Sequence, residues 1–319
     1  MNRRKTMVIA LGGNALIRKG QRGTIEEQFE NIRKSMEGVL YCLKKGYNIV
    51  ITHGNGPQVG NLLLMTETCR DQTPELTLGV CVADTEGEIG YMIQQSLTNA
   101  LRREKKETCA VTVLTQVVVD KNDKAFSCPA KPIGPFMKKE EAERFQKERG
   151  WNIAEDSQRG YRRVVASPAP LKIIEIQAIK SLLEAGNIVI AVGGGGIPVI
   201  IKENGDLEGV DVVIDKDLAS SVLARDIHAD SLVMLTGEEN VCLNYQNPDK
   251  QPLYHITAKE ASRYLNEGHF PPGSMGPKIQ AAIDFLKWGG AFALITSLDK
   301  VREAFEGNAG TKITMDLSS

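Results

Sequence analysis

The sequence has no excess of either charge and no apolar run long enough to cross a membrane. Its 39 Lys and Arg residues balance 40 Asp and Glu residues, which leaves a net charge of -1. Nucleic-acid-binding domains usually carry a basic excess, and proteins that dock on anionic lipid carry a basic cluster. A membrane span needs roughly 20 apolar residues. We therefore expect small-molecule ligands, with neither nucleic acid nor membrane as a partner.

Paired cysteines are also missing. No CxxC motif occurs among the six cysteines Cys42, Cys69, Cys81, Cys109, Cys128 and Cys242. This spacing predicts neither a disulfide framework nor a zinc site, and scattered reduced thiols are typical of cytosolic proteins. The basic residues at 3–5 precede an apolar run at 7–11, but a signal peptide needs ~7–15 apolar residues. We expect a buried first strand and a cytoplasmic protein.

The common nucleotide-binding and catalytic motifs do not occur either. The sequence contains no GxxxxGK[ST] motif and no GxGxxG motif after the first apolar run, so it is not a P-loop protein. The HRD and DFG motifs of protein kinases are absent, and so is the HExxH motif of zinc metalloproteases.

Short apolar runs alternate along the chain with segments of helical periodicity. Nearly continuous apolar runs predict buried strands at residues 7–11, 48–52, 111–119, 188–192, 231–235 and 293–296. Apolar residues at spacings of three and four predict helices at residues 25–43, 174–183, 258–265 and 279–286. Such alternation predicts an α/β fold in which helices cover both faces of a mainly parallel sheet.

Two segments interrupt this alternation. Residues 120–170 are polar and hold five of the 13 prolines, which predicts an inserted subdomain or lid with one helix at 138–149. Residues 200–210 contain the turn sequence Asn204-Gly205-Asp206 and predict a hairpin near a boundary between lobes. We therefore predict an N-terminal lobe at 1–208, carrying the insertion at about 120–170, and a C-terminal lobe at 209–319.

Glycine is frequent, with 30 residues in 319, and it gathers in four loops. Three loops follow predicted strands, at residues 12–14, 53–57 and 193–196, and the fourth, at 268–276, precedes a predicted helix. Ligands of open α/β sheets bind at the carboxyl ends of the strands, where glycine lets backbone N–H groups approach an anion. Glycine also serves ordinary turns, but this arrangement favours a phosphate-bearing ligand.

Two lysines lie in the first turns of predicted helices, where a cation opposes the helix dipole by about 0.3–1 kcal/mol. They are Lys216, within Asp215-Lys216-Asp217, and Lys278; Lys131 lies in the proline-rich insertion. A lone lysine at such a place is usually solvated, and Asp217 could simply stabilise a helix N-terminus. Together, beside the glycine loops, they favour a bound anion. Phosphoryl transfer suits this set, because its catalysis is mostly positioning and electrostatic stabilisation.

Six motifs of the chain resemble those of carbamate kinases, which belong to the amino acid kinase superfamily. They occur in the family order at residues 11–16, 53–60, 131–136, 193–199, 213–217 and 273–278. The resemblance implies a three-layer αβα fold, with carbamate or carbamoyl phosphate in the N-terminal lobe and nucleotide in the C-terminal lobe. It implies reversible phosphoryl transfer between ATP and carbamate, a carboxyl-type acceptor, in the ATP-forming direction during arginine catabolism. It also implies Mg²⁺ held by the nucleotide phosphates and water, and a homodimer in which Gly87 and Gly90 permit close helix packing, unless packing within the chain uses them.

The resemblance also implies roles for individual residues. The transferred phosphoryl group would lie among Gly12, Gly13 and Asn14, and carbamate near Gly54 and Asn55. Charge stabilisation would come from Lys131, Lys216 and Lys278, organised by Asp217. Further phosphate and nucleotide contacts would come from Gly195, Asp215, Thr236, Tyr245, Met275 and Gly276.

Other family members limit the alternatives. Ala10 stands where acetylglutamate kinases carry a lysine, and the resemblance gives that charge to Lys131 instead, which argues against an acetylglutamate substrate. A non-catalytic nucleotide sensor would be expected to lack the lysines, yet all three are present.

Residues 235–245 resemble the adenine-binding stretch of the family, although Gly237 and Glu238 replace the usual Asp-Val. Cys242 falls inside this stretch. We hypothesise that its thiol lies beside the nucleotide and that electrophiles that attack this thiol inhibit the phosphoryl transfer. The alternative is an inert small core residue, because no helix N-terminus or histidine is adjacent in sequence to lower its pKa.

Overall fold

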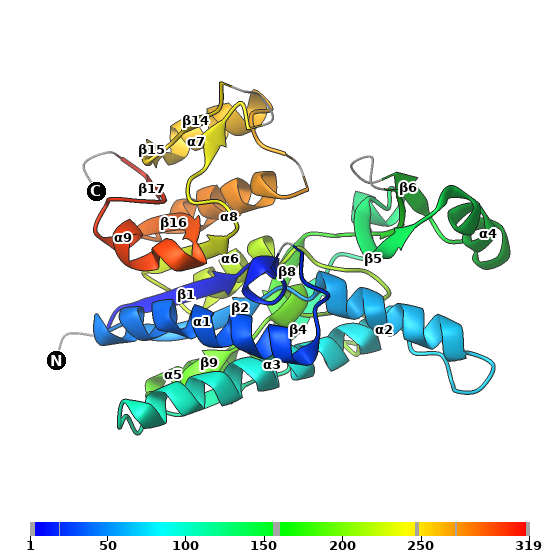
Figure 1. Ribbon diagram of the computed structural model, residues 1–319, viewed down its shortest axis with the longest axis horizontal. Coiled ribbons are helices and arrows are strands. Elements are labelled where there is room, and N and C mark those ends of the chain that lie inside the picture. The colour runs from blue at the N-terminus through cyan, green and yellow to red at the C-terminus, as the bar shows by residue number, and fades with distance from the viewer. Residues whose placement is uncertain (1–3, 19, 156–159, 246–248, 272, 317–319) are drawn as a thin grey trace.

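The computed structural model describes residues 4–18, 20–155, 160–245, 249–271 and 273–316; Pro272, in the fourth glycine loop, is outside them. Its centre is an eight-stranded sheet of order β15-β17-β16-β12-β1-β2-β9-β3 (Figure 1). Neighbouring strands from β16 to β3 are parallel, and β17 is antiparallel to β16. The bounds are β1 (Thr6–Leu11), β2 (Asn48–His53), β3 (Ala110–Thr112), β9 (Ile188–Ile190), β12 (Ser231–Thr236), β15 (His255–Thr257), β16 (Phe292–Ser297) and β17 (Thr311–Thr314).

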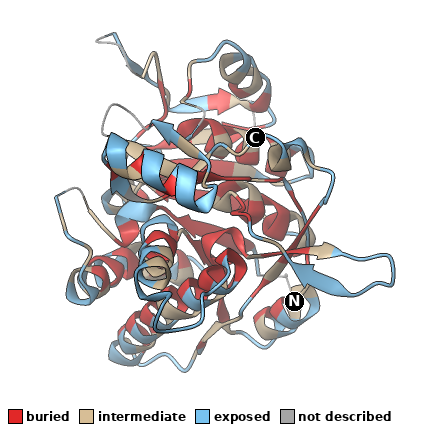
Figure 2. Cartoon of the chain, turned by 90° about the vertical axis from the view of Figure 1, so that its right-hand side faces the viewer, coloured by how far each residue is buried: buried red, intermediate tan, exposed pale blue. Residues whose placement is uncertain are grey.

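Helices cover both faces of this sheet, because successive side chains of a strand point to opposite sides. In β1, Met7 and Ile9 belong to one buried cluster and Val8 and Ala10 to the other. The first cluster is closed by α1 (Ile25–Lys44), α3 (Leu78–Arg103) and α9 (Val301–Phe305). The second is closed by α5 (Ile176–Glu184), α6 (Lys216–Asp226), α7 (Ala258–Asn266) and α8 (Met275–Lys287). The predicted three-layer αβα fold is confirmed, with buried residues in the central strands and on the helix faces that cover them (Figure 2).

The insertion folds as a small subdomain that projects from the body (Figure 1). It contains an antiparallel sheet of order β5-β7-β6, built from β5 (Lys131–Met137), β7 (Tyr161–Val165) and β6 (Ile153–Glu155), and the helix α4 (Lys139–Arg149). Its first strand packs tightly on α2 (Gly56–Cys69), where a Cβ atom added to Gly60 would lie 2.5 Å from the backbone nitrogen of Gly134. Glycine at position 60 therefore allows the subdomain to dock on α2.

The prediction of one strand at 111–119 is wrong. The chain forms β3 in the main sheet, leaves it, and then forms β4 (Gln116–Val119) in a second sheet of order β11-β10-β4-β8. Between them the chain turns, and the buried backbone N–H of Thr115 donates to a Glu86 carboxylate oxygen instead of to a strand. The other members are β8 (Pro170–Ile173), β10 (Ile197–Ile201) and β11 (Leu207–Gly209), and the antiparallel β10–β11 pair is the hairpin predicted at 200–210.

The main sheet is continuous across the predicted lobe boundary at 208/209. Strands β12, β16, β17 and β15 lie on one side of β1, and β2, β9 and β3 lie on the other, so the boundary stays a prediction. A short hairpin of β13 (Cys242–Leu243) and β14 (Gln251–Pro252) follows β12. None of the helices in the described ranges combines the length and the apolar character that a membrane span requires.

Candidate functional site

Two of the glycine loops meet where β1, β2 and β12 end in register. Leu11 is aligned with both His53 and Leu235. The Gly54 N–H donates to the Leu11 carbonyl at 3.2 Å, and the Gly12 N–H donates to the Leu235 carbonyl at 2.8 Å. A Cβ atom on Gly12 would lie 2.5 Å from that same carbonyl oxygen. Only glycine lets the chain leave β1 at this edge while remaining against β12.

The third loop, Gly193–Gly196, lies between the second glycine loop and the start of α6. Gly194 and Gly195 have φ values of +68° and +103°, a region that favours glycine. A Cβ atom on Gly194 would collide with the Asn55 side chain, and one on Gly195 would lie 2.9 Å from the backbone carbon of Ile214, next to Asp215. The loop is therefore packed between the end of β2 and the N-terminus of α6.

Lys216 and Lys278 converge on one buried carboxylate. Lys216 Nζ is 2.5 Å from Asp217 Oδ1, and Lys278 Nζ is 2.8 Å from Asp217 Oδ2. Side-chain exposure is 13% for Lys216, 11% for Lys278 and 5% for Asp217. The Lys216 side chain also reaches the second glycine loop, since a Cβ atom on Gly54 would lie 3.4 Å from Lys216 Cδ. Two ammonium groups thus share one carboxylate beside the glycine loops.

Lys131 reaches the same region from the inserted subdomain. Its Nζ lies 2.7 Å from Asp215 Oδ2, while Asp215 Oδ1 accepts from the Asp217 N–H at 2.9 Å and so caps α6. This contact ties the subdomain to the helix that carries Lys216. The three lysines outnumber the two aspartates of the cluster by one positive charge, which favours an anionic ligand.

The charges of the cluster depend on one another. Burial alone would raise the pKa of the Asp217 carboxyl, but the charges and hydrogen bonds of Lys216 and Lys278 lower it below its ordinary value. Burial lowers the pKa of Lys216, and the neighbouring Asp217 counteracts that shift. The carboxylate therefore stays ionised and favours the charged form of Lys216.

The residues predicted to bind nucleotide come from the N-terminus of α6, the end of β12, the segment after it and the first turn of α8. Thr236 ends β12, and the Tyr245 hydroxyl donates to Glu238 Oε1 at 2.6 Å, which raises the Tyr245 pKa to about 12. Met275 and Gly276 open α8, one turn before Lys278. Asn14 packs directly against Gly237, where an added Cβ atom would collide with its amide. The departure from the family pattern at 237 therefore leaves room for the Asn14 side chain.

Sequence reasoning missed three polar residues buried behind the glycine loops: His53, Glu86 and Thr115. Glu86 is 1% exposed, His53 and Thr115 are 0% exposed, and the Nε2 atom of His53 has no hydrogen-bond partner among the described residues. Burial lowers the His53 pKa to about 4. The available signal was at Glu86, a carboxylate that lies between Val82 and Ile89 in the apolar stripe of α3.

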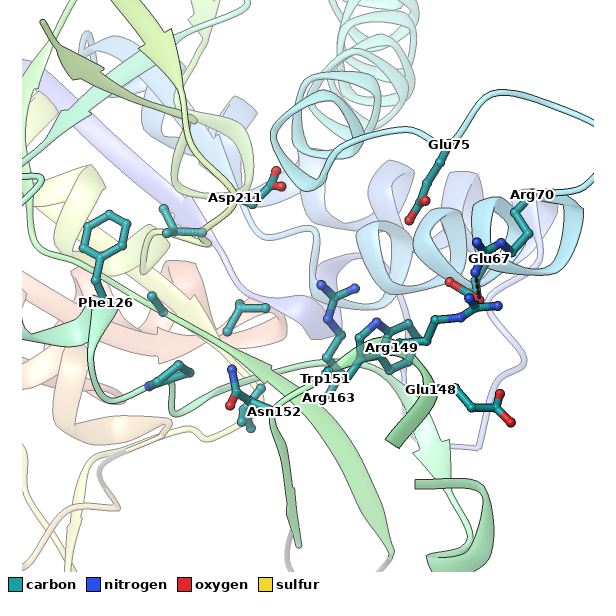
Figure 3. Close-up of a pocket in the computed structure, with 16 residues that line it drawn as sticks. Glu67, Arg70, Glu75, Phe126, Glu148, Arg149, Trp151, Asn152, Arg163 and Asp211 are labelled. Carbon is teal, nitrogen blue, oxygen red and sulfur yellow. Dashed lines mark hydrogen bonds and ion pairs between the residues drawn. The ribbon is translucent and has the colours of Figure 1, made fainter. Parts of the chain in front are cut away.

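A separate cavity of about 570 Å³ lies where the inserted subdomain meets α2 (Figure 3). Arg149 of α4 is paired with Glu67 of α2 at 2.8 Å, and the Arg163 guanidinium stacks 4.6 Å from the centre of the Trp151 ring. The residues that line this cavity do not include the three lysines. In the described ranges, no group of three or more His, Cys, Asp or Glu side chains is arranged to hold a metal ion.

Comparisons with known proteins identify relatives that match nearly the whole chain. The sequence model of the amino acid kinase family matches residues 5–297. The chain is 50% identical to the carbamate kinase of Thermococcus kodakarensis, over 98% of this chain and 100% of that protein. The structure of the Giardia lamblia carbamate kinase bound to AMP-PNP superposes with a TM-score of 0.91 at 41% identity, covering 99% of this chain and 100% of that one. A second structure of the Giardia enzyme, thiocarbamoylated by disulfiram on its Cys242, has a TM-score of 0.89 at 41% identity and covers 98% and 99% of the two chains.

Proposed function

The chain belongs to the amino acid kinase family, and within it to the carbamate kinases, and we propose that it transfers a phosphoryl group reversibly between ATP and carbamate. The ATP-forming direction, from carbamoyl phosphate and ADP, is the physiological one in this proposal, as a step of arginine catabolism in the cytoplasm. Carbamoyl phosphate is a mixed anhydride, so its phosphoryl group is readily transferred. The observation that carries the proposal is the pair of buried lysines on Asp217, next to the glycine loops.

The described side chains suit a transfer that needs no general base. Carbamate is already an anion, so no proton has to be removed before it accepts or releases the phosphoryl group. Lys216 and Lys278 would stabilise the negative charge on the transferred group, and Lys131 would add charge from the subdomain. Gly12, Gly13 and Asn14 would surround the phosphoryl group, with the backbone N–H groups of Gly13 and Asn14 orienting its oxygens, and Gly54 and Asn55 would border the carbamate. Asp217 would hold two of the lysines in place.

The nucleotide would lie on the β12 side of the sheet edge. Thr236 and Tyr245 would border the proposed adenine site, and Asp215, Met275 and Gly276 lie close in sequence to the lysine cluster. Gly195, in the third glycine loop, would instead contribute to the phosphate and substrate contacts. Mg²⁺, bound through the nucleotide phosphates and water, would neutralise charge on those phosphates; the proposal names no protein ligand for the ion.

The direct test is ATP formation from carbamoyl phosphate. Protein mixed with ADP, Mg²⁺ and carbamoyl phosphate should produce ATP, measured by luminescence, well above a protein-free control that corrects for spontaneous decay of carbamoyl phosphate. Acetylglutamyl phosphate should not replace carbamoyl phosphate, since Ala10 offers no charge at the position where acetylglutamate kinases carry a lysine. No ATP above the control would refute the proposed function.

We also propose that Cys242 lies beside the nucleotide. Its thiol is 8% exposed, and burial raises its pKa, so at neutral pH it reacts as a slow, protonated thiol. Support for its reactivity, although not for its placement, comes from the Giardia structure, in which disulfiram modifies a cysteine that bears the same number. Saturating ADP should slow alkylation of Cys242 without slowing that of exposed Cys109, as followed by mass spectrometry of peptides. Equal rates with and without ADP would contradict this placement.

A homodimer remains part of the proposal. Gly90 is used within the chain, since an added Cβ atom would collide with the Thr112 side chain, so it is not available for packing between subunits. The outer face of α3 instead exposes Val80 and Tyr91, at 45% and 57%, beside the more open Gly87. Sedimentation velocity distinguishes a dimer from a monomer.

A further inference from the structure

Glu86 is a carboxylate buried in the layer beneath the glycine loops, and its two oxygens bind two different segments of backbone. Oε1 accepts from the Gly193 N–H at 2.8 Å, and Oε2 accepts from the Thr115 N–H at 3.1 Å. Glu86 itself is 1% exposed and lies on α3, a helix of 26 residues. One rigid helix therefore fixes the entrance of the third glycine loop and the turn that precedes β4.

The same turn supports the loop a second time. The Val192 N–H donates to Thr115 Oγ1 at 3.0 Å, and Val192 has φ of +54°, an unfavourable conformation for a β-branched residue. Strained backbone of this kind persists only where its surroundings hold it. Glu86 and Thr115 supply that support, because they bind the N–H groups of Gly193 and Val192.

Gly193 is packed too closely to carry a side chain. A Cβ atom on Gly193 would lie 2.5 Å from His53 Cε1 and 2.8 Å from Glu86 Cγ. Gly193 thus rests directly on both buried side chains, and His53 connects it to the end of β2. Burial raises the pKa of Glu86 to about 8. The two backbone N–H donors oppose this rise, because they favour the ionised form.

We propose that Glu86 is a positioning residue for phosphoryl transfer, which holds the Gly193–Gly195 loop in the path that places it against Asn55 and the start of α6. This inference rests on the proposed function. Glu86 would act on carbamoyl phosphate through the loop and Asn55, and it would have no effect on the adenine side of the site. A residue needed only for folding would affect both substrates alike.

The variant Glu86→Gln tests the inference because it keeps the shape but can accept only one of the two N–H bonds; its amide NH₂ faces the other donor. We expect turnover in ATP formation to fall by about tenfold or more and KM for carbamoyl phosphate to rise, while KM for ADP stays within about twofold. The matched control is Glu88→Gln, half-exposed on the same helix, which should behave as the wild type. Unchanged kinetics, or KM values that rise together for both substrates, would overturn the proposal.

Hydrogen exchange provides a readout that does not require activity. In Glu86→Gln, peptides covering residues 191–197 should exchange faster, whereas peptides covering β12 should keep their wild-type protection. If Glu86→Gln does not fold, Thr115→Val replaces it. This variant removes the hydroxyl that accepts from the Val192 N–H and donates to the Val113 carbonyl. The KM for carbamoyl phosphate should again rise while the KM for ADP stays unchanged, and wild-type values would overturn the proposal. If the wild-type protein forms no ATP, the proposed function is refuted. The exchange experiment then still decides whether Glu86 fixes the loop.

Discussion

Replacing Lys216 or Lys278 by alanine should lower turnover in ATP formation by about 10²–10³-fold, the loss that follows removal of one donor from an oxyanion-stabilising site. Both ammonium groups are buried beside the glycine loops, so water does not replace the lost charge efficiently. The charge that develops on the transferred group would then be stabilised by one fewer cation. Steady-state kinetics with saturating ADP and carbamoyl phosphate measure the effect.

The matched control is Lys287→Ala. Lys287 lies on the same helix as Lys278 but is exposed in its last turn, so turnover should change by less than about twofold, as is usual for surface substitutions. Thermal melts of all three variants separate lost catalysis from lost folding. A decrease of less than about tenfold, which is roughly 1.4 kcal/mol, in a folded variant would remove that lysine from the catalytic set.

Most of the main sheet could be predicted because its strands are buried on both faces. Such strands have nearly continuous apolar sequences. The apolar runs at 7–11, 48–52, 231–235 and 293–296 correspond to β1, β2, β12 and β16. Residues 111–119 look the same in sequence, yet they divide between two sheets. The division depends on Glu86, which lies far away in sequence and binds the Thr115 N–H, so a local pattern does not reveal it.

The site was predictable to the extent that its chemistry is local. Glycine loops after strands and lysines in first helical turns are visible in short segments, and the structure brings Gly54, Lys216 and Lys278 to one edge of the sheet. Their roles in catalysis stay predictions. The resemblance implied that Asp217 organises the lysines, but no local pattern predicts its contact with Lys278, because the two residues are 61 positions apart and lie on different helices. The contact of Lys131 with Asp215 spans 84 residues and needs the subdomain to dock.

Substituting Asp217 by asparagine should lower the free energy of unfolding by about 3–5 kcal/mol, the cost of leaving buried charges without their partner. The amide keeps the shape of the carboxylate, but Lys216 and Lys278 would lose the only carboxylate that either contacts among the described residues. Asp226→Asn, at the other end of α6 and half-buried, is the matched control and should cost less than about 1 kcal/mol. Urea titrations at neutral pH compare the three proteins.

An anion should restore part of what Asp217→Asn loses. Inorganic phosphate binds the folded state only, so it stabilises according to its concentration relative to its dissociation constant, and a site with two uncompensated lysines should bind it more tightly than the wild type does. Phosphate should therefore raise the melting temperature of Asp217→Asn more than that of wild type or Asp226→Asn. An equal rise in all three proteins would show that the cluster does not bind the anion.

The pH dependence of the free energy of unfolding tests whether the charge of Asp217 causes this stability difference. The lysines lower the pKa of Asp217 in the folded protein below the ordinary value of 3.8, so the unfolded chain takes up this proton first as the pH falls. The carboxylate accordingly contributes its full stability above about pH 5, and that contribution is lost as the pH decreases through 3.8 toward the folded-state pKa. The stability difference between wild type and Asp217→Asn should thus be constant from pH 5 to neutrality and shrink in acid. A difference that stayed constant below pH 4 would mean that the carboxylate charge does not hold the two lysines together.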